Sequence, residues 1–131
     1  MSLTLQVLFV FLGGALGAAG RYWVSGIVAR RAGETFPWGT LVVNVSGAFL
    51  LGLLAGVVLA VGTPNDVHAW PFLAAGVLGS YTTVSSFSLQ TFELIRGDEL
   101  REAFSNVILS FVLCLAAAAA GLLGGLAFAG T

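Results

Sequence analysis

Long apolar stretches without a charged residue dominate the pattern of this 131-residue chain. They cover residues 1–20, 35–65, 69–92 and 103–131. Each stretch reaches the ~17–25 residues that a membrane-spanning helix needs. We therefore predict an all-α membrane protein with four transmembrane helices in a single domain, residues 1–131. The predicted spans cover residues 3–30, 37–62, 69–95 and 102–128.

The composition agrees with a bilayer location. Hydrophobic residues make up 58% of the chain and charged residues 8%, with a mean hydropathy of +1.01. A soluble domain of this size could not hide so much apolar surface from water. The net charge of −1 gives no sign of a nucleic-acid partner. A single cysteine, Cys114, and a single histidine, His68, leave no metal-ligand cluster and argue against an enzyme.

The arginines predict an orientation in the membrane. The chain has no lysine, and four of its five arginines lie in the first and third connections: Arg30, Arg31, Arg96 and Arg101. The positive-inside rule places these two connections in the cytoplasm and both termini outside the cell membrane. The first uncharged stretch ends in ALGAAG, which is similar to a signal-peptide cleavage site. No Lys or Arg precedes Arg21, however, so we expect a retained helix.

Small residues at a spacing of four predict close helix packing. Gly13 and Gly17 share one helix face, and the same spacing recurs in the second span at Ala48, Gly52 and Gly56. Such stripes let helices approach closely in lipid. Arg21 continues the first stripe. It either snorkels to the headgroups or lies at a pore mouth, where its charge would concentrate anions.

Polar residues inside the second and fourth spans need partners. Asn44 lies among valines, and an amide that faced lipid would be costly. In the fourth span Asn106, Ser110 and Cys114 follow at a spacing of four and form a polar track. The periodicity supports interhelical hydrogen bonding and pore lining equally.

The third span combines glycines with a run of hydroxyls. Gly76 and Gly79 lower the helix propensity, and the hydroxyl residues that follow are Thr82, Thr83, Ser85, Ser86 and Ser88. We predict that this helix is broken in mid-membrane, which would free carbonyl oxygens for a cation and hydroxyls for an anion. The alternative is a kinked helix that serves packing only.

Three motifs in order make the chain resemble the Fluc family of fluoride channels over its whole length. They are GGALGAAGRY in the first span, WGTLVVN at the start of the second and GVLGSYTTVSSFS in the third. The resemblance implies an antiparallel dimer with two pores, through which fluoride leaves the cell passively and which protect it from fluoride toxicity. It also implies a structural sodium ion at the dimer centre, held by the backbone carbonyls of Gly79 and Thr82 from both subunits.

The resemblance also implies which residues meet fluoride. Arg21 would lie in a vestibule. The candidate pore residues are Asn44, Thr83, Ser85, Ser86, Phe87, Asn106 and Ser110. The chain departs from the family at Val84, where a phenylalanine ring edge is expected, and further departures are Ser80, Gln90, Asn106 and Cys114. A fluoride site that uses Val84 should be weaker, because valine has no ring quadrupole.

The arginine bias leaves the identity of the second subunit open. An antiparallel homodimer requires one chain to insert both ways, whereas a biased chain suits a heterodimer whose partner supplies the missing phenylalanine. A non-conducting partner subunit is therefore an alternative function. A small proton-coupled multidrug transporter is a weaker alternative. It would need a membrane-embedded carboxylate, and Glu93 lies only at the end of the third span.

Overall fold

The computed structural model describes residues 3–33, 35–62 and 71–130, all of which lie in helices or in the short connections between them. Four helical runs are long and apolar enough to cross a membrane. They are Leu3–Ala32, Trp38–Val61, Phe72–Arg96 and Leu100–Ala129. The prediction of an all-α chain with four membrane-length helices is confirmed. The first two residues of the predicted third span, and His68, lie outside the described residues.

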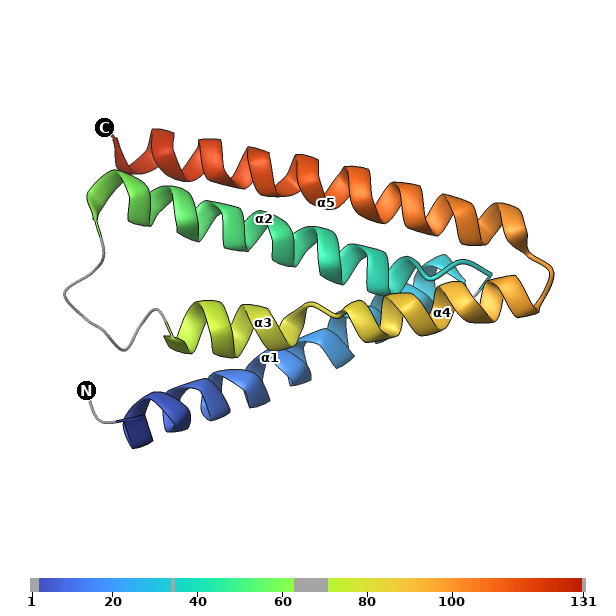
Figure 1. The fold of residues 1–131 in the computed structure, drawn as a ribbon, viewed down its shortest axis with the longest axis horizontal. Helices are drawn as coiled ribbons and strands as arrows, with labels where there is room; N and C mark the ends of the chain where they lie inside the picture. Colours follow the sequence, from blue (N-terminus) through green and yellow to red (C-terminus); the bar gives the residue numbers. More distant parts are fainter. Residues whose placement is uncertain (1–2, 34, 63–70, 131) are drawn as a thin grey trace.

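The third run consists of three helical pieces. The whole order is α1 (Leu3–Ala32), α2 (Trp38–Val61), the π-helix η1 (Pro71–Leu78), α3 (Gly79–Tyr81), α4 (Val84–Arg96) and α5 (Leu100–Ala129). Figure 1 shows α2 and α5 side by side along most of their length, with α1 beside the first pieces of the third run. The piece α4 continues beyond a short non-helical segment and packs on α5.

Glycines bring α2 and α5 into backbone contact. A Cβ added at Gly52 or Gly56 would meet the carbonyl oxygen of Ala118 or Leu122. From the other side, a Cβ at Gly121 would meet the carbonyl oxygen of Phe49. The predicted packing role of the second-span stripe is confirmed for both of its glycines.

The stripe of α1 makes a similar contact with η1. Gly13 and Gly17 are buried, and an added Cβ would meet the carbonyl oxygens of Phe72 and Val77, respectively. The first half of the third run is therefore held against α1. Arg21, four residues beyond Gly17, lies past this contact at the level of the interruption in the third run.

A tight turn holds α4 against the start of α5. The backbone N–H of Gly97 donates to the Glu93 carbonyl at 2.9 Å, and the N–H of Glu99 donates to the Leu94 carbonyl at 2.9 Å. Asp98 between them has a φ of 63°, in the left-handed region that aspartate tolerates better than most residues. The two halves of the third run thus have different neighbours, α1 and α5.

Large apolar side chains lie mainly on the outside. Phe11 is 70% exposed and Phe111 is 67% exposed, whereas the buried hydrophobic side chains of the described residues are Leu41, Val43 and Ala103. In water this surface would be unfavourable, but lipid tails are as apolar as the side chains themselves. The fold is therefore that of a multi-pass membrane protein.

Candidate functional site

The helical pieces α3 and α4 are separated by two extended residues. Thr82 has φ −75° and ψ 158°, and Thr83 has φ −151° and ψ 122°. The Thr82 hydroxyl donates to the Leu78 carbonyl at 3.1 Å, as does the Thr82 backbone N–H. The chain therefore stays hydrogen-bonded up to Thr82 and leaves the helical conformation there.

Asn44 of α2 pairs with the backbone of Thr83. The Thr83 N–H donates to Asn44 Oδ1 at 2.7 Å, and Asn44 Nδ2 donates to the Thr83 carbonyl at 2.9 Å. Thr83 is buried, with 7% of its surface exposed, so both backbone groups would otherwise lack partners. The amide of Asn44 replaces the helical hydrogen bonds that the interruption removes.

The interruption leaves two carbonyls without their usual helical donors. In a continuous helix the N–H of Thr83 would donate to Gly79, and the N–H of Ser86 would donate to Thr82. The first donates to Asn44 instead, and the second donates to the Thr83 hydroxyl at 3.1 Å, which caps α4. The carbonyl oxygens of Gly79 and Thr82 are hard ligands of the type that suits a sodium ion.

The hydroxyls of the run form a small network on α4. Thr83 Oγ1 donates to Ser86 Oγ at 3.2 Å and lies 3.2 Å from Ser85 Oγ. A hydroxyl has one proton, so Ser85 donates to Thr83 and the proton of Ser86 remains for another acceptor. The side chains of Thr83, Ser85 and Ser86 are thus brought together as the sequence suggests.

Arg21 borders a cavity of about 270 Å3 together with two of these residues, Thr83 and Ser86. Its lining includes Arg21 and Ser25 of α1, Thr40 of α2, and Thr83 and Ser86 at the interruption. Arg21 makes no ion pair with a carboxylate of the described residues. A cation without a paired carboxylate, beside several hydroxyls, gives this cavity the chemistry of an anion site.

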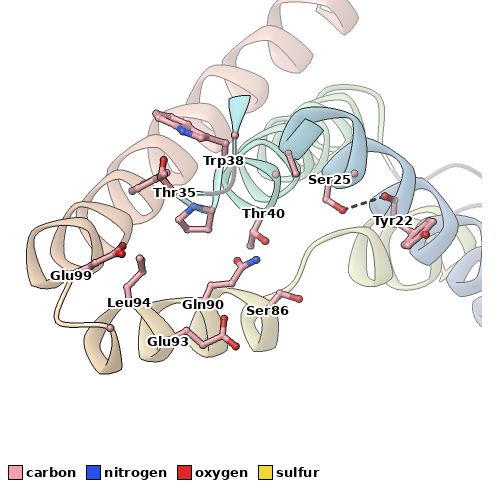
Figure 2. A pocket seen from close by; sticks show the side chains of 17 residues that line it. Tyr22, Ser25, Thr35, Trp38, Thr40, Ser86, Gln90, Glu93, Leu94 and Glu99 are labelled. Carbon is pink, nitrogen blue, oxygen red and sulfur yellow. Dashed lines mark hydrogen bonds between the residues drawn. The ribbon is translucent and has the colours of Figure 1, made fainter. Parts of the chain in front are cut away.

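A larger cavity of about 590 Å3 lies next to it. Figure 2 shows Ser86, Gln90 and Glu93 of α4 on one side, with Thr40 and Trp38 on the other. The Gln90 oxygen Oε1 is buried without a hydrogen-bond partner among the described residues. Because Ser86 and Thr40 line both cavities, the two spaces adjoin at the level of these side chains.

A mainly apolar groove of about 530 Å3 lies on another face of the interruption. Several predicted site residues line it together: Asn44, Gly79, Thr82, Thr83, Phe87 and Ser110. Val84 also lines the groove and is 77% exposed. Ser85 is exposed and joins these residues only through its hydroxyl contact with Thr83.

Asn106 lies between α4 and α5 and borders neither the groove nor the two cavities. It is 2% exposed, and Nδ2 donates to Thr91 Oγ1 at 2.9 Å. Ser110 Oγ donates to Asn106 Oδ1 at 3.5 Å. Of the two readings of the fourth-span track, interhelical hydrogen bonding therefore describes Asn106, and groove lining describes Ser110 and Cys114.

Two site residues escape the sequence analysis. Thr40 lines both cavities near Arg21 and is buried, and Thr91 is the α4 partner of Asn106. Thr40 belongs to the WGTLVVN motif, so the family resemblance could have pointed to it. Thr91 lies four residues after Phe87 and continues the hydroxyl run, but its partner on another helix has no signature in the local sequence.

The fold and site define a class: a small multi-pass membrane protein whose interrupted span gathers hydroxyls, an amide and an arginine. The chain matches the family described as CrcB-like protein, Camphor Resistance (CrcB), over residues 8–122. With a match of this extent, the chain belongs to that family.

Curated relatives cover most of the chain. A fluoride-specific ion channel FluC 2 from Rhodopseudomonas palustris is 53% identical over 116 residues, which is 88% of both chains. A FluC 2 from Bradyrhizobium diazoefficiens is 50% identical over 89% of this chain and 86% of its own. A FluC from Opitutus terrae is 50% identical over 84% of both chains. All three are named as ion channels rather than as enzymes.

Proposed function

We propose that this protein is a fluoride-selective channel that lets fluoride leave the cell passively, driven by the membrane potential and the fluoride gradient. The observation that carries the proposal is the interruption at Thr82 and Thr83, with Asn44 on one side and the Arg21 cavity on the other. Relatives that are 50–53% identical and are named fluoride-specific ion channels support it. The interruption then lies at mid-membrane depth, in the inner membrane of the cell.

Fluoride is small and strongly hydrated, so a selective pore must replace its water with close donors that also let it go. Asn44 uses one N–H on the Thr83 carbonyl and has a second to offer. The hydroxyl proton of Ser86 is left over by the Thr83 network. With Thr83, Ser85, Ser110 and the ring edge of Phe87, these groups give a series of weak sites along the interruption.

Arg21 would raise the local concentration of anions without binding them tightly. It borders a cavity with Thr40 and Ser86, and this cavity adjoins the larger space along α4. A guanidinium attracts anions over several ångströms, because its charge is not balanced by a nearby carboxylate. We propose this route as the vestibule through which fluoride reaches the interruption.

The second subunit would cover the groove at Gly79, Thr82 and Val84. An antiparallel copy or a related chain seated there would bring four carbonyl oxygens, from Gly79 and Thr82 of each subunit, around one sodium ion. The ion would accept the lone pairs of these oxygens and join the two subunits, and it would not be transported. The loss of the usual donors to both carbonyls supports this assignment.

A partner subunit of a heterodimeric channel, with one pore or none of its own, is the second candidate function. Val84 favours it, because this exposed side chain stands where a phenylalanine edge is expected and offers no ring quadrupole. The arginine bias also favours a single orientation, with both termini outside.

Fluoride efflux from liposomes that contain this chain alone tests the proposal. A fluoride electrode should record rapid loss of fluoride, while a chloride electrode on a matched sample records retention. Equal loss of both ions, or no fluoride loss even with a co-expressed paired subunit, would overturn the channel function. Fluoride loss only with the partner would select the heterodimer.

A further inference from the structure

Thr91 determines the orientation of the buried Asn106 amide, that is, which of its two terminal atoms faces α4. The Thr91 hydroxyl donates its proton to the Phe87 carbonyl at 2.7 Å. Because a hydroxyl has one proton, Thr91 can only accept from Asn106 Nδ2, which lies 2.9 Å away. The nitrogen of the amide therefore faces Thr91 on α4, and its oxygen Oδ1 faces the opposite way.

Asn106 Oδ1 accepts the hydroxyl proton of Ser110 and so competes for it with any anion in the groove. Ser110 Oγ donates to Asn106 Oδ1 at 3.5 Å, a long and therefore weak hydrogen bond. Asn106 is 2% exposed, so water cannot readily take the place of this donor. Ser110 also lines the groove that contains Asn44 and Phe87. Its proton thus has two destinations, the amide oxygen or an anion in the groove.

We infer that Thr91 and Asn106 are positioning residues that weaken anion binding at Ser110. An anion in the groove must draw the Ser110 proton away from Oδ1 and leave that buried oxygen without a donor, which has a free-energy cost. Such a cost keeps the site weak, as rapid passage of an ion through successive sites requires. This inference rests on the proposed function, because it concerns the affinity of the same site for fluoride.

Thr91→Val is the first variant, since valine has the same shape without the hydroxyl. The Asn106 amide then loses its acceptor on α4 and gains by turning Nδ2 toward Ser110 Oγ. Ser110 would accept from the amide, and its proton would be free for the groove. The fluoride concentration that gives half-maximal efflux should fall about threefold, the equivalent of one weak hydrogen bond. Thr91→Ser keeps the hydroxyl and should match the wild type.

The direction of this effect separates positioning from packing. If Thr91 only supported the helix contact, its substitution would lower the amount of active protein and leave the fluoride concentration for half-maximal efflux unchanged. Ser110→Ala provides a second check, because the inference acts through this hydroxyl. In the Ser110→Ala background, Thr91→Val should have no further effect.

The double variant Thr91→Val/Asn106→Leu covers the case in which the single variant does not fold. Replacing both partners by apolar groups of similar shape is close to neutral for stability. It also removes Oδ1, so the half-maximal concentration should again fall about threefold. An unchanged or higher value in this double variant or in Thr91→Val would overturn the inference, as would a Thr91→Val effect that persists without the Ser110 hydroxyl.

Fluoride binding measured by ¹⁹F line broadening, with the protein in micelles, distinguishes this inference from the proposed function. If the wild type binds fluoride but does not conduct alone, the same variants are compared by titration and the same shift is expected. If the wild type neither binds nor conducts, both proposals fail. If it does either and the variants do not shift, only the role of Thr91 and Asn106 fails.

Discussion

The α2–α5 contact depends on glycines, whereas the interruption between α3 and α4 depends on polar side chains. In the first, Gly52, Gly56 and Gly121 let two continuous helices meet backbone to backbone. In the second, the helix stops, and Asn44 and Thr83 provide the hydrogen bonds that the backbone has lost. The comparison teaches that glycine lets two helices pack closely without disturbing their own backbone hydrogen bonds, whereas at the break a polar side chain from another helix replaces the bonds that are lost.

Asn44→Leu should have the largest effect, because it removes that partner. The N–H and the carbonyl of Thr83 would both be left buried without a hydrogen bond, at about 1–3 kcal/mol for each group. We expect a loss of about 3 kcal/mol in the free energy of unfolding in micelles, together with loss of fluoride efflux. Val42→Leu on the same helix, at a 38% exposed position, is the control and should be close to wild type. Equal stability of the two variants would refute the role of Asn44.

Gly121→Ala should have the next effect, at the α2–α5 contact. The added methyl would meet the carbonyl oxygen of Phe49, so the helices must separate, at about 2 kcal/mol for an overpacked site. Gly124→Ala is the matched control, because its Cβ would meet only Leu53 Cδ1 at 3.8 Å, an ordinary contact. Thermal unfolding of the two variants in the same detergent measures the difference. A melting temperature of Gly121→Ala at or above that of the control would contradict the close contact.

Thr83→Ala tests the cap of α4 separately from the Asn44 pairing. The backbone bonds of Thr83 to Asn44 remain, but the Ser86 N–H loses its acceptor, which costs about 1 kcal/mol for an N-cap. Thr83→Ser keeps the hydroxyl and should lose much less stability. Chemical unfolding in micelles, followed by helical circular dichroism, measures both. The hydroxyl has no capping role if serine and alanine give the same midpoint.

Val84→Phe should change the stability of the monomeric chain in micelles least, by less than about 0.5 kcal/mol, because the side chain is exposed on the groove of the single subunit. Its expected effect is on conduction, since a ring edge becomes available to the anion. Fluoride efflux from liposomes with this chain alone should rise. Val84→Leu adds bulk without a ring and should not raise efflux. A rise in both variants would attribute the effect to packing and not to the ring.

Much of the fold follows from local sequence, and the site follows only in part. The uncharged stretches predict four membrane-length helices, because length and apolarity are properties of single segments. Spacing of four predicts the faces on which Gly13, Gly17, Gly52 and Gly56 pack. The π-helix η1 was not predicted, since no residue type marks it in Pro71–Leu78.

The partners of polar residues could not be predicted from spacing. Periodicity shows that Asn44 and Asn106 need hydrogen bonds, but not that one meets the Thr83 backbone and the other meets Thr91. Those partners lie 39 and 15 residues away along the chain, and their choice depends on how the helices are rotated. The roles suggested for these residues by family resemblance remain predictions that the variants above address.

The split of the third run between two neighbours has a mechanical consequence. Its first half is packed on α1 through the contacts at Gly13 and Gly17, and its second half is held to α5 by the tight turn and by Asn106. Any shear between these two bodies is concentrated in the two extended residues that join them. The Asn44 amide bridges that joint from a third helix, so sliding of one half past the other would stretch its two hydrogen bonds to Thr83.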